Sequence, residues 1–115
     1  MTGVREALQE VIDATDELIE SLHDHREFGR EAIGRLDDGQ DLPTVRARPP
    51  AAVRERTQVA QKTMDMTRSR MRDVVMQACI DAGMTTRDIA KEWGVSRQLV
   101  ERHTSPAARA RVAGR

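Results

Sequence analysis

Four polar side chains near the end of the sequence have a spacing that places them on one side of a short helix. Arg97 and Glu101 are four residues apart, which is one helical turn. Gln98 and Arg102 repeat this spacing. Arginine can donate two hydrogen bonds to guanine, glutamine can pair with adenine, and glutamate can accept a bond from cytosine. These residue types could therefore contact base edges.

The helices that would position these side chains have clear start and stop signals. Thr85 and Asp88 match a capping box at the beginning of one short helix, and Gly94 can end it because glycine turns with positive φ without a Cβ penalty. Ser96 is a favourable N-cap for a last helix, which we expect to reach about His103.

Apolar spacing predicts that these two helices pack against a third. Ala90 is small where the two short helices must cross closely. The apolar positions expected in the shared core are Ile89, Trp93, Val95, Leu99 and Val100, with Val74, Val75, Ala78 and Cys79 from the preceding segment 70–82.

The stretch TRDIAKEWGVSRQLVERHTS, residues 86–105, resembles the helix-turn-helix of bacterial transcription regulators. It is also similar to the promoter-reading fourth region of sigma factors. The resemblance implies that the last helix enters the major groove, while residues at the start of the preceding helix hold phosphates. The DNA-binding residues it implies are Thr85, Thr86, Arg87, Ser96, Arg97, Gln98, Glu101 and Arg102. Lys91, Arg68 and Arg72 are further phosphate candidates.

Other residue types that could do chemistry do not form a recognisable site. His23 and His25 are two apart on a predicted helix, so they cannot share a metal on one face. Cys79 lies between Ala78 and Ile80 and is typical of a buried thiol. No spacing of Ser, His, Cys or carboxylates suggests catalysis. We therefore expect no enzyme activity, no metal and no cofactor.

Charge is unevenly distributed along a chain whose formal net charge is zero. Residues 1–45 hold 12 acidic residues against 4 arginines, a balance of −8, whereas residues 46–115 hold 15 basic residues against 7 acidic ones, a balance of +8. This asymmetry indicates that only the second half meets a polyanion. The lack of a basic-then-apolar leader and the single cysteine favour a cytoplasmic, nucleoid-associated protein that does not enter a membrane.

The N-terminal part is predicted to be helical and to mediate oligomerisation. Apolar residues from Val4 to Leu22 follow a coiled-coil spacing that Thr15 interrupts, and a helix with such a stripe must bury it. Asp24 and Glu27 match a capping box that would begin a second, shorter helix, with Phe28, Ala32, Ile33 and Leu36 on its buried face. A bent continuation of the first helix is the alternative.

We therefore expect an all-α protein with four segments. They are an acidic helical oligomerisation segment at 1–36, an extended connector with prolines at 37–49, a long helix plus the helix-turn-helix unit at 50–105, and a flexible basic tail at 106–115. The function expected is sequence-specific binding of double-stranded DNA by a homodimeric transcriptional regulator. The alternatives are a phage packaging, partition or recombination accessory protein, or an interaction module whose acidic helices bind a protein partner.

Overall fold

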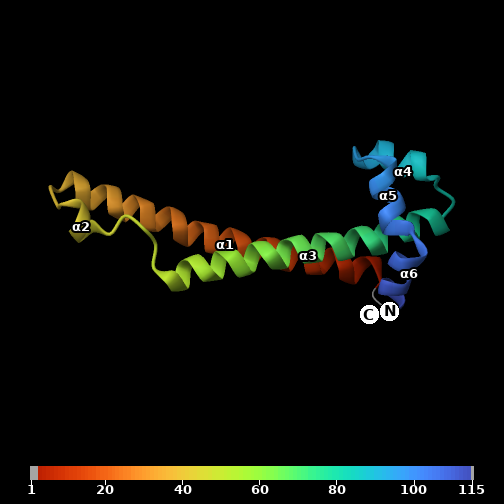
Figure 1. Ribbon diagram of the computed structural model, residues 1–115, viewed down its shortest axis with the longest axis horizontal. Coiled ribbons are helices and arrows are strands. Elements are labelled where there is room, and N and C mark those ends of the chain that lie inside the picture. The colour runs from red at the N-terminus through yellow and green to blue at the C-terminus, as the bar shows by residue number, and fades with distance from the viewer. Residues whose placement is uncertain (1–2, 115) are drawn as a thin grey trace. The chain divides into compact units, whose positions relative to one another are not determined.

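The structure is a computed structural model that describes residues 3–114 of the chain. This range contains six helices and no strand, which confirms the all-α prediction (Figure 1). None of its helices is long and apolar enough to span a membrane. The helices are α1 (Val4–Asp37), α2 (Leu42–Val45), α3 (Ala51–Asp81), α4 (Thr86–Trp93), α5 (Arg97–Thr104) and α6 (Pro106–Ala113).

The helices form two compact units, and α1 and α3 each contribute to both. Unit 1 contains the described residues up to Ile12 together with those from Asp65 onward, and unit 2 contains Asp13–Met64. This division differs from the predicted separation of an N-terminal segment at 1–36 from a C-terminal segment at 50–105. The prediction followed the chain order, whereas the beginning of α1 belongs to the same unit as α4, α5 and α6.

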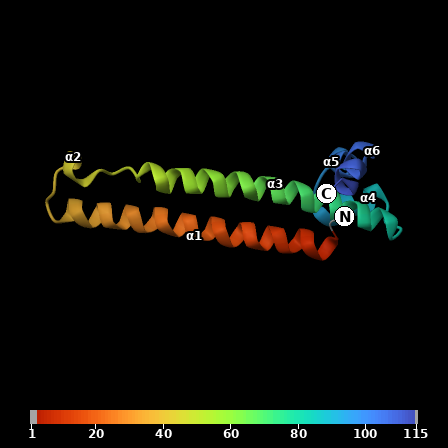
Figure 2. The ribbon, with the colours of Figure 1, turned by 90° about the horizontal axis from the view of Figure 1, so that it is seen from below.

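Unit 2 is a helical hairpin in which α1 and α3 run in opposite directions (Figure 2). Small buried residues line its interior, so the two backbones can approach closely: Ala14, Ser21 and Ala32 from α1, and Thr57 and Ala60 from α3. The hydroxyl group of Thr15 donates a hydrogen bond to the sulfur of Met64 at 3.5 Å. Thr15, the residue that interrupts the predicted seam, thus contacts the opposite helix.

Unit 1 contains two apolar clusters that pack against α3. Met76, Ile89, Ala90 and Val100 form the buried centre of the first cluster, where α3 meets α4 and α5. Trp93 is partly buried against the same centre, which confirms its predicted role in the core. The second cluster joins α1, α3 and α6 through Ala7, Val74 and Val112.

The contribution of α3 to the helix-turn-helix core differs from the prediction. Met76, whose sequence position favoured a core or interface role, is fully buried there, together with the partly buried Cys79. Val74, which was predicted to pack on the two short helices, instead contacts the α1 and α6 side. The reason is that α3 in unit 1 has packing partners on two sides, so its apolar residues divide between them.

The sequence left open whether a second helix begins near Asp24 or the first helix continues, and the structure has the continuation, because α1 runs without a break to Asp37. The carboxylates of the supposed capping box have other partners. Asp24 accepts a hydrogen bond from Arg56 of α3 at 2.8 Å, and Glu27 pairs with Arg30 one turn later, also at 2.8 Å.

The two segments expected to lack helix both contain one. In the connector at 37–49, Asp41 caps α2 by accepting a bond from the Thr44 amide. The tail at 106–115 was predicted to be flexible, yet it contains α6, which Ser105 caps and Pro106 begins. The helix is stabilised because Ala108 and Val112 are buried against its neighbours, which composition alone did not reveal.

Most of the apolar stripe predicted to mediate oligomerisation is exposed in the single chain, and so are two residues predicted for the buried face of a second helix. The exposed large aliphatic side chains of α1 are Val4, Leu8, Ile12, Ile19, Leu22, Ile33 and Leu36. Small residues on a neighbouring stripe of the same helix, Ala7 and Ala14 among them, are buried in their place. Helix α1 therefore has one apolar stripe inside the fold and another on its surface.

The Gly94 corner gives a prediction about stability. Gly94 has a φ of +66°, and a Cβ added there would meet nothing within 4 Å, so the cost of Gly94→Ala is conformational and not steric. We expect the substitution to lower the free energy of unfolding by about 1–2 kcal/mol, as measured by urea denaturation.

Gly29→Ala is the matched control, because Gly29 lies inside α1 and also has open space around it. Since alanine favours a helix interior, this substitution should raise the free energy of unfolding by about 1 kcal/mol. Equal effects of the two substitutions would contradict the strain assigned to Gly94.

Candidate nucleic-acid interface

Helices α4 and α5 of unit 1 are joined by a corner with defined hydrogen bonds. Thr85 accepts a bond from the Asp88 amide at 3.1 Å, and the Asp88 carboxylate accepts one from the Thr85 amide at 3.4 Å, which confirms the predicted capping box. At the other end of α4, Gly94 is left-handed and its amide bonds back to the last turn. Ser96 then caps α5 by accepting from the Leu99 amide.

Buried residues hold one side of α5 against the rest of unit 1. Val100 is fully buried in the apolar core, and His103 is buried one turn later. His103 donates a hydrogen bond from Nδ1 to the carboxylate of Asp73 on α3 at 2.7 Å. The backbone carbonyl of His103 accepts another from the side chain of Gln77 at 3.1 Å. These contacts fix the rotation of α5 about its own axis.

Asp73 joins α5 and α6 to α3. Its side chain is 1% exposed, and besides His103 it accepts two hydrogen bonds from the guanidinium of Arg111, at 3.2 and 3.3 Å. Burial alone would raise the pKa of the Asp73 carboxyl group. The hydrogen bonds and positive charges of Arg111 and His103 outweigh burial, so this pKa lies below its ordinary value.

With this side buried, the predicted base-contacting residues lie on the solvent side of α5. All four are exposed: Arg97, Gln98, Glu101 and Arg102. Arg87 is exposed at the beginning of α4, and Thr86 beside it is half-buried. Thr85 and Ser96 are exposed, and their hydroxyl oxygens already act as helix caps. The predicted site residues thus surround the α4–α5 corner on its accessible side.

Sequence reasoning missed the residues that hold the helix in place. Asp73, His103 and Arg111 are brought together across 30 and 38 positions of the chain, and no local spacing links them. The sequence likewise did not predict that Arg68 and Arg72 of α3 lie close to Arg102 of α5. All three line one hollow between these two helices.

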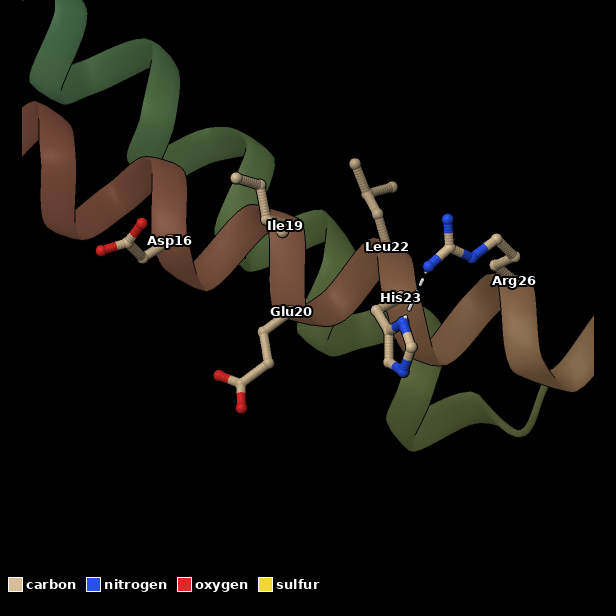
Figure 3. A pocket seen from close by; sticks show the side chains of 6 residues that line it. All are labelled: Asp16, Ile19, Glu20, Leu22, His23 and Arg26. Carbon is tan, nitrogen blue, oxygen red and sulfur yellow. Dashed lines mark hydrogen bonds between the residues drawn. The ribbon is translucent and has the colours of Figure 1, made fainter.

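A second hollow lies on the outer surface of α1 in unit 2, with a volume of about 720 Å³. Ile19 and Leu22 line it and point to the same side of the helix, whereas Glu20 points to the other (Figure 3). Asp16 lies at one end, and Arg26 lies at the other, with its guanidinium 3.0 Å from His23. The hollow is therefore apolar at its centre, acidic at one end and basic at the other.

Residues 3–114 bring together no group of three or more His, Cys, Asp or Glu side chains that could hold a metal ion. Cys79 is partly buried against the apolar core, as its neighbours in the sequence predicted.

Comparisons with known proteins add no further assignment. No protein-family model matches the chain, and no curated protein or solved structure matches it either.

The pKa of Asp73 leads to a prediction about pH. Because its pKa is lower in the folded chain than in the unfolded one, Asp73 stabilises the fold above the unfolded value and loses this effect as the pH falls through the folded value. We expect Asp73→Asn to lower the free energy of unfolding by about 1–3 kcal/mol at pH 7. The difference from the wild type should begin to narrow below about pH 4, where Asp73 of the unfolded chain becomes protonated, and should be lost only as the pH falls through the lower pKa of the folded chain.

The control is Asp81→Asn, which breaks an exposed ion pair with Arg109 at 3.1 Å. Such a pair contributes about 0–1 kcal/mol, so this variant should unfold almost like the wild type. If Asp73→Asn lowered the free energy of unfolding by the same amount at every pH, the charge of Asp73 would not be the source of the stabilisation.

Proposed function

We propose that the chain binds double-stranded DNA in a sequence-specific manner through α5 and acts as a homodimeric transcriptional regulator. The observation that carries this proposal is the division of α5 into two sides. Val100 and His103 are buried and fix the helix, while Arg97, Gln98 and Glu101 are exposed and have donors and acceptors suited to base edges. A helix held in this way can present the same side chains to every duplex it meets.

Charge and helix ends support contacts with the DNA backbone. Arg87 lies in the first turn of α4, where the amide groups and the helix dipole also favour a phosphate. The excess of basic over acidic residues from position 46 onward favours the same partner. Phosphate contacts of this kind would position α5, and the base contacts would supply specificity.

The exposed stripe of α1 supports the dimer. In unit 2, Ile19 is 60% exposed, Leu22 is 46% exposed and Ile33 is 61% exposed, and such side chains are normally buried. We propose a second copy as the partner, because the hollow has Asp16 at one end and Arg26 at the other. Two copies packed in opposite directions would place the acidic end of one against the basic end of the other.

A basic protein partner on the acidic helix has less support. Three carboxylates of the acidic surface, those of Glu17, Glu20 and Asp24, already bind one side chain of the same unit, Arg56 of α3, at 2.8–3.3 Å. The hydrogen bond to Glu17 and the nearby negative charges raise the pKa of Arg56, so its own charge is retained. These carboxylates are therefore less available to a partner than the sequence suggested.

Base contacts by α5 can be tested by selecting binding sites from random duplexes. We expect the wild type to select a pseudo-palindrome whose half-sites are about 34 Å apart, or a multiple of this distance. Arg97→Ala and Gln98→Ala should each relax the preference at one base pair by about 1–3 kcal/mol and leave the fold intact, because both side chains are exposed.

Arg87→Ala is the contrasting variant, since removing a phosphate contact should weaken binding to all sequences alike. If the wild type shows no salt-sensitive binding to any duplex, the proposed function is wrong. Binding without sequence preference would instead favour an accessory role in packaging, partition or recombination.

The dimer has its own test in light scattering after size-exclusion chromatography. Ile19→Ser with Leu22→Ser should convert a dimer to a monomer of unchanged helicity, because both side chains lie on the exterior of their unit. Val59→Ser on α3 changes a side chain that is similarly exposed, at 64%, and should leave the mass unchanged. A wild type that is monomeric at every concentration would contradict the proposed dimer.

A further inference from the structure

A hollow of about 280 Å³ in unit 1 lies between one side of α3 and one side of α5. Arg68 and Arg72, four residues apart, enter it from α3, and Arg102 enters from α5. Arg111 of α6 also lines it. Four guanidinium groups from three helices therefore surround one space, and among the described residues that line it only Asp65 is acidic.

The four arginines differ in their partners. Arg111 is engaged, because its guanidinium bonds to the buried carboxylate of Asp73. Within residues 3–114, the side chains of Arg68, Arg72 and Arg102 have no ion pair or hydrogen bond. Three unpaired positive charges next to one another repel, so the hollow would be stabilised by an anion.

We infer that this hollow binds a phosphate group of the DNA backbone beside the base pairs that α5 contacts. The inference rests on the proposed function, and it changes the role of one residue: Arg102 contacts a phosphate and not a base. Arginine suits this ligand because its planar guanidinium can donate two parallel hydrogen bonds to phosphate oxygens. The duplex is the favoured source, because Arg102 belongs to the same exposed helix as Arg97 and Gln98.

The position of Arg102 within α5 supports a phosphate contact and not a base contact. Arg97 and Gln98 lie in the first turn of the helix, the end that usually contacts base edges in this type of motif. Arg102 lies in the last turn and shares the hollow with Leu99 and with two arginines of α3. A side chain directed toward α3 at this end is suited to the edge of a groove, where the phosphates lie.

The test measures the affinity of the full chain for its selected duplex and for a scrambled duplex over a range of salt concentrations. Arg68→Gln with Arg72→Gln, and separately Arg102→Gln, should weaken binding to both duplexes by the same factor. The slope of log affinity against log salt should fall by about 1 for each phosphate that the variant no longer neutralises. Arg102→Lys retains the charge and should restore most of the slope. Circular dichroism checks that each variant is folded.

The control is Arg30→Gln, which removes an exposed arginine of unit 2 and should leave the slope unchanged. The inference is overturned if the wild type binds DNA but neither hollow variant changes the slope, or if Arg102→Gln alters the preference between duplexes. If the wild type binds no duplex at all, the proposed function fails, and this inference fails with it.

Discussion

The carboxylate of Asp73 holds three helices of unit 1 together. It lies in α3 with almost no exposure, and it binds His103 of α5 and Arg111 of α6. A buried carboxylate is costly unless its oxygens are satisfied, so the arrangement is favourable only when both partners are in place. The exposed side of α5 depends on this interaction, because the helix could otherwise rotate on an apolar core that has little directional preference.

The hairpin of unit 2 is held together by small buried residues and not by a buried charge. Ala14, Ser21 and Ala60 are buried between two helices, so the backbones can pack closely without large side chains. The consequence is that the larger aliphatic residues of α1, Ile19 and Leu22 among them, are not needed inside the unit. They remain on the surface, where they can be buried only by another molecule.

The sequence could predict the features that depend on near neighbours. The capping box of Thr85 and Asp88, the left-handed Gly94 and the Ser96 cap each involve residues a few positions apart, and all three are found. Local patterns failed where a distant partner decided the outcome. Asp24 lies inside α1 and is bound by Arg56, a residue 32 positions away, so it does not act as the cap that the local pattern favoured.

Partners that are distant in the sequence also explain the other differences between the predicted and the observed structure. Helix α1 has two stripes with helical spacing, and the sequence does not say which of them meets α3. The smaller residues, Ala7 and Ala14 among them, are the ones buried inside the fold. Residues 106–113 looked unstructured because their alanines and arginines are typical of a flexible tail, but burial of Val112 depends on Ala7 and Val74. The same holds for the candidate site. Its exposed residues could be identified from the sequence, whereas the buried residues that hold α5 in place could not.

The contact between Ala7 and Val112 also bears on how the chain is made. The two residues belong to one apolar cluster although they lie at opposite ends of the described chain. During translation, α4 and α5 leave the ribosome before α6 does, so this cluster cannot close until α6 has been synthesised. Closing such a long loop is slow compared with forming local helices. Unit 1 can therefore be completed only after α6 has been made, by which time the hairpin of unit 2 has already been available to form.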